Sequence, residues 1–176
     1  MTPSQISDMI ERLKSYYVVA SMGLRFVADP RWQELYDSFG IDRGSTMRLG
    51  RRDDTYYECL DIYKAHDQVQ GPGYNLDFLG AMLSVMLVWI GDELAREKYF
   101  DRSPQLEFLR HLRNGVAHGN TFSLIRGEPR RPAFFGQFRI TPELHGHNVL
   151  FEYMMAGDLF DLFDDVAIHL RKLPSS

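Results

Sequence analysis

FLRHLRNGVAHGN, residues 108–120, has the pattern of an amphipathic helix that ends at a glycine. Ser103-Pro104 supplies the start signal, and Gly119 supplies the end signal. Apolar residues recur between them at the spacing of one helix face. These are Leu106, Leu109, Leu112 and Val116. The pattern therefore predicts a helix that carries Arg113, Asn114 and His118 at its C-terminal end.

Arginine and histidine together can cleave RNA without a metal ion. Arginine binds phosphate in a planar, bidentate way, and the ordinary pKa of histidine allows it to move protons near neutral pH. Asn114 and His118 are four residues apart and share a helix face, so Asn114 could orient the imidazole or the phosphate. The alternative is that Arg113 and His118 only stabilise the last carbonyl groups of their helix.

The Arg113–Asn114–His118 set resembles the Arg-x4-6-His motif of the HEPN superfamily (higher eukaryotes and prokaryotes nucleotide-binding). That resemblance implies a mainly α fold, a helical bundle, in which these three residues are catalytic. It also implies a homodimeric, metal-independent endoribonuclease without a cofactor, which leaves 2′,3′-cyclic phosphate and 5′-hydroxyl ends on its RNA substrate. Many such proteins are toxins of toxin–antitoxin systems or anti-phage defence effectors, so an antitoxin or regulatory protein partner is expected.

The resemblance also leaves a second function open. Other HEPN-like dimers have lost the chemistry and only bind a nucleotide, RNA or a protein partner. One subset has a tyrosine two residues after the motif histidine, where this chain has Asn120. Regulation by modification of that tyrosine is therefore not expected here.

Composition indicates a single domain over residues 1–176, long enough to bury a core. The net charge of −4 argues against a general nucleic-acid coating protein, although a site needs only local positive charge. The lone Cys59 allows no internal disulfide, which fits a cytoplasmic location. Two local basic clusters could be ligand sites or solvated faces: Arg43, Arg48, Arg51 and Arg52, then Arg126, Arg130, Arg131 and Arg139.

The longest apolar run, Phe78 to Ile90, is shorter than the roughly 20 residues of a membrane span. No secretory signal is evident at the N-terminus. We therefore expect no membrane contact, and a helix buried on all sides in the bundle centre or at a subunit interface.

Start signals, stop signals and apolar spacing predict the remaining elements. Because a short connector separates residues 75–97 from the motif helix, these two helices should be antiparallel, with Tyr74, Asn75 and Asp77 near His118. Residues 133–140 and 149–153 read as two strands of a hairpin with its turn at 142–147. The whole predicts a HEPN-like helical bundle with a small β-hairpin insertion before the last helix. Further helices are expected at about residues 3–24, 30–39, 53–66 and 157–172.

Metal-binding patterns are weak in this sequence. His145 and His147 lie in a predicted turn without a nearby cysteine or carboxylate partner, which makes a poor zinc site. Asp158, Asp161, Asp164 and Asp165 are better explained as a solvated helix start. We therefore assign no metal site.

Overall fold

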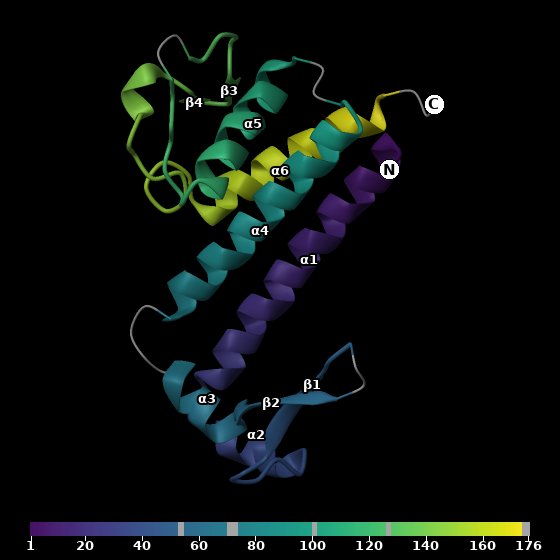
Figure 1. Ribbon diagram of the computed structural model, residues 1–176, viewed down its shortest axis with the longest axis vertical. Coiled ribbons are helices and arrows are strands. Elements are labelled where there is room, and N and C mark those ends of the chain that lie inside the picture. Colours follow the sequence, from purple (N-terminus) through teal and green to yellow (C-terminus); the bar gives the residue numbers. More distant parts are fainter. Residues whose placement is uncertain (53–54, 70–73, 100–101, 126–127, 174–176) are drawn as a thin grey trace. The chain divides into compact units, whose positions relative to one another are not determined.

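The computed structural model describes residues 1–52, 55–69, 74–99, 102–125 and 128–173. They form two compact units: Met1–Tyr17 with Gly80–Ser176, and Val18–Leu79. The fold is mainly α, as predicted. That residues 1–176 form a single domain stays a prediction. The elements are α1 (Pro3–Val27), α2 (Trp32–Ser38), β1 (Thr46–Gly50), β2 (Tyr56–Asp61), α3 (Ile62–Val69), α4 (Tyr74–Arg96), α5 (Pro104–Ala117), β3 (Phe134–Phe135), β4 (Phe138–Arg139), η1 (Pro142–Leu144) and α6 (Ala156–Arg171) (Figure 1).

The first unit is a helical bundle in which α5 and α6 pack with parts of α1 and α4 (Figure 1). Contacts from α1 to α6 include the hydrogen bond from Ser7 Oγ to the Ala167 carbonyl at 3.3 Å, and edge packing of Tyr17 on Phe160. Burial of apolar side chains is the main stabilising contribution in such a bundle. Its fully buried side chains include Ile6, Ile10, Leu83, Leu87, Ile90, Leu94, Leu106, Leu109, Leu112, Leu162 and Val166.

Two helices of this unit begin and end where the sequence predicts. Helix α5 begins at Pro104 and ends at Ala117, with Gly119 in the left-handed region at φ 84°. Helix α6 begins at Ala156, where Asp158 accepts a hydrogen bond from the Met155 amide at 2.9 Å. All the apolar positions predicted to face inward on these two helices are buried.

Helix α4 is buried on one side only, so it does not lie at the bundle centre, and its predicted place at a subunit interface stays a prediction. Leu83, Leu87 and Ile90 are fully buried, whereas Val85 is 60% exposed and Trp89 is 49% exposed. The reason is that the neighbouring helices cover only one side of α4, although apolar residues occur on both. An apolar helix face that no part of the unit covers is typical of an interaction surface.

By length and composition alone, Leu76–Arg96 could cross a membrane, and it is the one such helix among the described residues. The run Phe78–Ile90 therefore underestimates the apolar length of this helix, because the flanking residues extend it. Its buried leucine side packs in the core of the first unit.

The β-hairpin before the last helix is present, but it is smaller than predicted. Strands β3 and β4 pair antiparallel around Gly136, whose φ is 53°, so both strands lie inside the segment predicted as one. The turn predicted at 142–147 contains η1, and residues 149–153 form turns with an isolated bridge between Leu150 and Met154. Gly136 supplies the positive φ of the observed turn. This turn interrupts residues 133–140, which the sequence pattern predicted as one continuous strand.

In the second unit, the helix predicted over residues 53–66 is wrong in its first half. Strands β1 and β2 form an antiparallel pair in which Leu49 is opposite Tyr57, and α3 begins only at Ile62. Tyrosine at positions 56 and 57 favours a strand. Pairing of this strand with residues 46–50 completes the hairpin. Residues 53 and 54 and the side chain of Cys59 lie outside the described part of the chain.

An aromatic cluster joins α2 to α3 in this unit. The Trp32 ring stacks on buried His66 at 3.7 Å, and Tyr36 and Tyr63 pack edge-on against the Trp32 ring. Leu35 and Phe39, by contrast, are exposed.

Candidate functional site

Close packing of α5 on α4 positions Arg113. A Cβ atom at Gly91 would lie 2.6 Å from Cγ of Arg113, so only glycine leaves room for the arginine stem there. On the opposite side of α5, a Cβ atom at Gly115 would lie 2.5 Å from Cγ2 of Val149. These two glycines fix the C-terminal half of α5 between α4 and the segment around Val149.

The guanidinium of Arg113 is held by two neighbours. Its Nε donates to Oδ1 of Asp92 at 2.9 Å, its Nη2 also contacts that oxygen, and its Nη1 donates to Oδ1 of Asn114 at 3.2 Å. Three of the five N–H groups are thereby used, which leaves one on each terminal nitrogen. The Arg113 side chain is 29% exposed, so these remaining donors can reach a phosphate.

His118 is the residue that ends α5. Its backbone N–H donates to the Asn114 carbonyl at 3.1 Å, and its side chain is exposed. Within the described residues, its imidazole makes no hydrogen bond, including none to Arg113 or Asn114. Asn114 therefore orients Arg113 rather than the imidazole.

Asn120 has a structural role that the sequence reading missed. It adopts a left-handed conformation, with φ 62°, and its amide bonds both backbone groups of Leu150. Its Oδ1 accepts from the Leu150 N–H at 2.8 Å, and its Nδ2 donates to the Leu150 carbonyl at 3.3 Å. Asparagine directly after a helix-ending glycine was the available signal, because asparagine tolerates positive φ.

The predicted neighbourhood of His118 stays a prediction. The side chains of Tyr74 and Asn75 lie outside the described residues, and Asp77 belongs to the other unit. Val116, two residues before His118, shares a groove with residues from the middle of α4.

That groove has a volume of about 430 Å³ and lies directly beside the Arg113–Asp92 pair. Val85 and Trp89 form its exposed apolar part, and Asp92 lies at its edge. The groove thus joins an uncovered apolar surface to the charged residues of the motif. Its lining residues are Ser84, Val85, Val88, Trp89, Asp92 and Val116.

The weak metal candidates are held by other contacts. His145 Nδ1 accepts from the Leu124 N–H at 3.2 Å, and His147 Nδ1 pairs with Glu152 at 2.7 Å. Asp158 caps α6, and Asp164 pairs with Lys14. Among the described residues, no three or more His, Cys, Asp or Glu side chains lie together as a group that could hold a metal ion.

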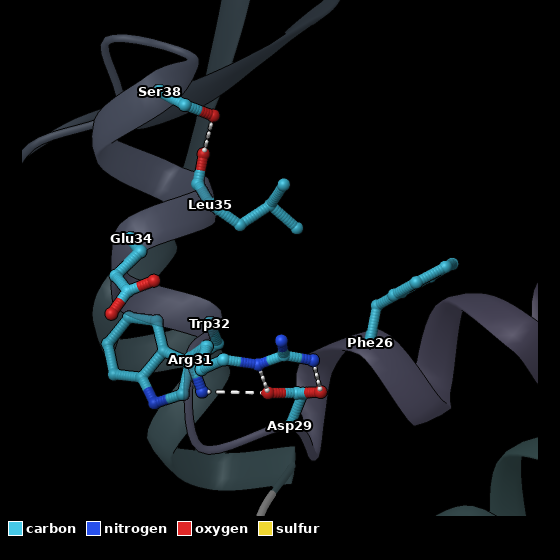
Figure 2. A pocket seen from close by; sticks show the side chains of 7 residues that line it. All are labelled: Phe26, Asp29, Arg31, Trp32, Glu34, Leu35 and Ser38. Carbon is cyan, nitrogen blue, oxygen red and sulfur yellow. Dashed lines mark hydrogen bonds and ion pairs between the residues drawn. The ribbon is translucent and has the colours of Figure 1, made fainter.

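A second recess, of about 330 Å³, lies in the other unit at the end of α1 and the start of α2 (Figure 2). Arg31 forms two 3.0 Å hydrogen bonds to Asp29, and these bonds lower the pKa of Asp29 to about 2. Phe26 and Leu35 supply its apolar lining. Arg31 and Asp29 neutralise each other, and Glu34 adds a further negative charge to the lining.

The first predicted basic cluster lies in this unit. The Arg43 guanidinium stacks over the Tyr63 ring at 5.3 Å, while Arg51 and Arg52 are exposed. The side chain of Arg48 lies outside the described residues.

No known protein-family model, curated protein or solved structure matches this chain. The resemblance to HEPN proteins therefore stays a prediction from the sequence motif.

Proposed function

We propose that the protein is a metal-independent endoribonuclease of the HEPN type that acts as a homodimer. The observation that carries this proposal is the end of α5. There an exposed imidazole, His118, follows a guanidinium, Arg113, which Asp92 and Asn114 hold with two donors unused. One group can move a proton and the other can bind a phosphate, as the resemblance requires.

The proposed reaction is transesterification within the RNA strand. The 2′-oxygen forms a bond to the adjacent phosphorus, the bond from phosphorus to the 5′-oxygen breaks, and a 2′,3′-cyclic phosphate results. One proton leaves the 2′-hydroxyl and one is added to the departing 5′-oxygen. His118 moves the proton, and Arg113 stabilises the negative charge that grows on the phosphate.

A homodimer would supply two copies of each group. The uncovered face of α4 with Val85 and Trp89 is the surface we assign to the second copy, because it adjoins Asp92 and therefore Arg113. A two-fold axis there would bring both motifs to one cleft without any further sequence. One His118 could then accept a proton while the other donates one.

The site variants test this proposal. Wild-type protein should cut RNA in excess EDTA, whereas Arg113→Ala and His118→Ala should lose about 10²–10³-fold or more in rate while remaining folded. Matched controls are Arg12→Ala, at an exposed position of α1, and His169→Ala, on α6. Equal rates for wild type and His118→Ala would contradict the proposed site.

A toxin or anti-phage effector restrained by an antitoxin or other regulatory protein is the cellular role we propose for such an enzyme. Expression of wild type should then arrest growth, and expression of His118→Ala should not. Equal toxicity of the two proteins would oppose this role.

A binding module is the alternative, and one specific contact favours it. Asp92 neutralises much of the Arg113 charge, which reduces the attraction for phosphate. A non-catalytic HEPN-like dimer would bind nucleotide, RNA or a protein partner, would cut no RNA, and would keep its function after His118→Ala.

A further inference from the structure

A pocket of about 410 Å³ that is lined by charged side chains lies beside the first half of α5. It contains four arginines and two glutamates, so its formal charge is +2 in a chain whose net charge is −4. A local concentration of guanidinium groups in an acidic protein points to an anionic ligand. The pocket is lined by Arg102, Glu107, Arg110, Glu128, Arg130 and Arg131.

Glu107 organises two of these arginines. It is only 6% exposed, and it accepts hydrogen bonds from Arg110 at 2.8 and 3.0 Å and from Arg131 at 3.2 Å. Burial raises the pKa of Glu107, but these hydrogen bonds and the two positive charges outweigh burial and lower it overall. The carboxylate is therefore ionised at neutral pH and fixes both guanidinium groups at the pocket wall.

Arg102 and Arg130 are in a different position. Both are exposed, and neither has a hydrogen bond or ion pair to another described residue. Among the described residues, none uses their guanidinium donors, while Glu128 is occupied with the Ile125 N–H at 3.1 Å. Two unpaired and two fixed guanidinium groups match a ligand with several negatively charged oxygens, which a phosphate group supplies.

The position of the pocket along α5 decides which phosphate it suits. Arg110 and Asn114 are spaced by four residues, so they lie on one face of α5, and His118 directly follows the end of that helix. The rise from Arg110 to His118 is about 12 Å at 1.5 Å per residue, a length of about three stacked nucleotides. A nucleic-acid strand along this face would pass from the motif to the arginine pocket.

We propose that this pocket binds a backbone phosphate of the same RNA strand whose scissile phosphate lies at Arg113 and His118. The inference rests on the proposed function and extends it, because it assigns the path of the strand. It also gives a role to Arg130 and Arg131, half of the second basic cluster in the sequence. Arg139 is outside the pocket, stacked over Phe134 at 5.0 Å, and Arg126 lies outside the described residues.

The test uses the double substitution Arg102→Gln with Arg130→Gln, because neither arginine supports a buried carboxylate. Substitution of Arg110 or Arg131 would leave Glu107 short of partners and could unfold the protein. Arg12→Gln is the matched control, at an exposed position of α1 in the same unit. Thermal unfolding should show that both proteins remain folded.

Binding is measured with a labelled 2′-O-methyl RNA strand, which cannot be cleaved, over a series of salt concentrations. We expect the double variant to bind about tenfold more weakly, and its plot of log affinity against log salt to be shallower by about 0.7 per lost contact. Arg12→Gln should match wild type in both affinity and salt dependence.

Three other results would overturn either this inference or the proposed function. If wild type binds the RNA and the double variant binds it equally well, the pocket is not on the strand path and the inference fails, whatever the nuclease result. If the double variant loses RNA affinity but wild type cuts no RNA, the nuclease proposal fails and the pocket remains an RNA contact. If calorimetry shows that wild type binds 5′-AMP, and the double substitution abolishes that binding without changing RNA affinity, the ligand is a free phosphate monoester and the strand assignment is overturned.

Discussion

At the scale of single residues, the state of Arg113 governs the proposed chemistry. Asp92 and Asn114 use three of its donors, so the guanidinium is fixed before any ligand arrives. Such preorganisation reduces the cost of orienting the group in the transition state, although it also weakens the positive charge. Asp92 is thus a positioning residue that the motif itself does not reveal.

Substitution of Asp92 measures this balance. Asp92→Asn should lower kcat by up to about a hundredfold through misplacement of Arg113, with a smaller change in KM. Steady-state kinetics on a short RNA, with thermal unfolding as the check on folding, separates positioning from stability. Unchanged kcat in a folded Asp92→Asn protein would show that Arg113 needs no such support.

His111 predicts an acid sensitivity of the fold. Burial lowers its pKa, and the Arg110 charge lowers it further, while Glu128 and Glu107 act in the opposite direction. The unfolded chain therefore takes up a proton near the ordinary histidine pKa of about 6.5, where the folded chain does not. Stability should fall as pH drops below that value.

His111→Gln removes the titrating group and should reduce this loss. The measurement is the free energy of unfolding of wild type and variant at pH 7.5 and pH 5.5. His66→Gln is the matched comparison, because burial also lowers the pKa of His66 in the second unit. An equal loss of stability in wild type and His111→Gln would rule out His111 as a source.

At the scale of elements, the approach of α4 to α5 forms the site. Gly91→Ala would place a methyl group against the Arg113 stem and should displace the guanidinium. We expect cleavage to fall by about tenfold or more, with a destabilisation of about 1–3 kcal/mol. Gly157→Ala is the control, because nothing lies within 4 Å of its added atom in α6, and it should be neutral or stabilise by about 0.5–1 kcal/mol. Full activity of Gly91→Ala would contradict the packing argument.

The elements also show what sequence patterns could and could not give. Helices α1, α4, α5 and α6 follow from start signals, stop signals and apolar spacing, and at the start of α1 the Thr2 hydroxyl accepts from the Gln5 N–H at 3.2 Å. The prediction for residues 46–61 was wrong, because these residues form a hairpin. A hairpin depends on pairing between its two strands, and the spacing of apolar residues within one segment does not show that pairing. The placement of Arg113, Asn114 and His118 on one helix end was predictable, whereas Asp92 was not, because α5 packs against the middle of α4.

At the scale of the whole molecule, the exposed face of α4 predicts a homodimer. Val85→Asp should give a folded monomer with little nuclease activity, because a charge at this exposed apolar position opposes association but not folding. Light scattering after gel filtration gives the mass in solution. Ile168→Asp is the control, at a similarly exposed apolar position of α6, and should keep the wild-type mass. A monomeric wild type with full activity would remove the need for a second copy.

The chemistry of the cut ends tests the central claim most directly. Total tRNA is incubated with wild-type protein and with His118→Ala in excess EDTA, and the ends of the fragments are identified. We predict 2′,3′-cyclic phosphate and 5′-hydroxyl ends from wild type and no fragments from His118→Ala. Fragments with 3′-hydroxyl ends, or no cutting of any of several RNAs by folded, dimeric wild-type protein, would contradict the account.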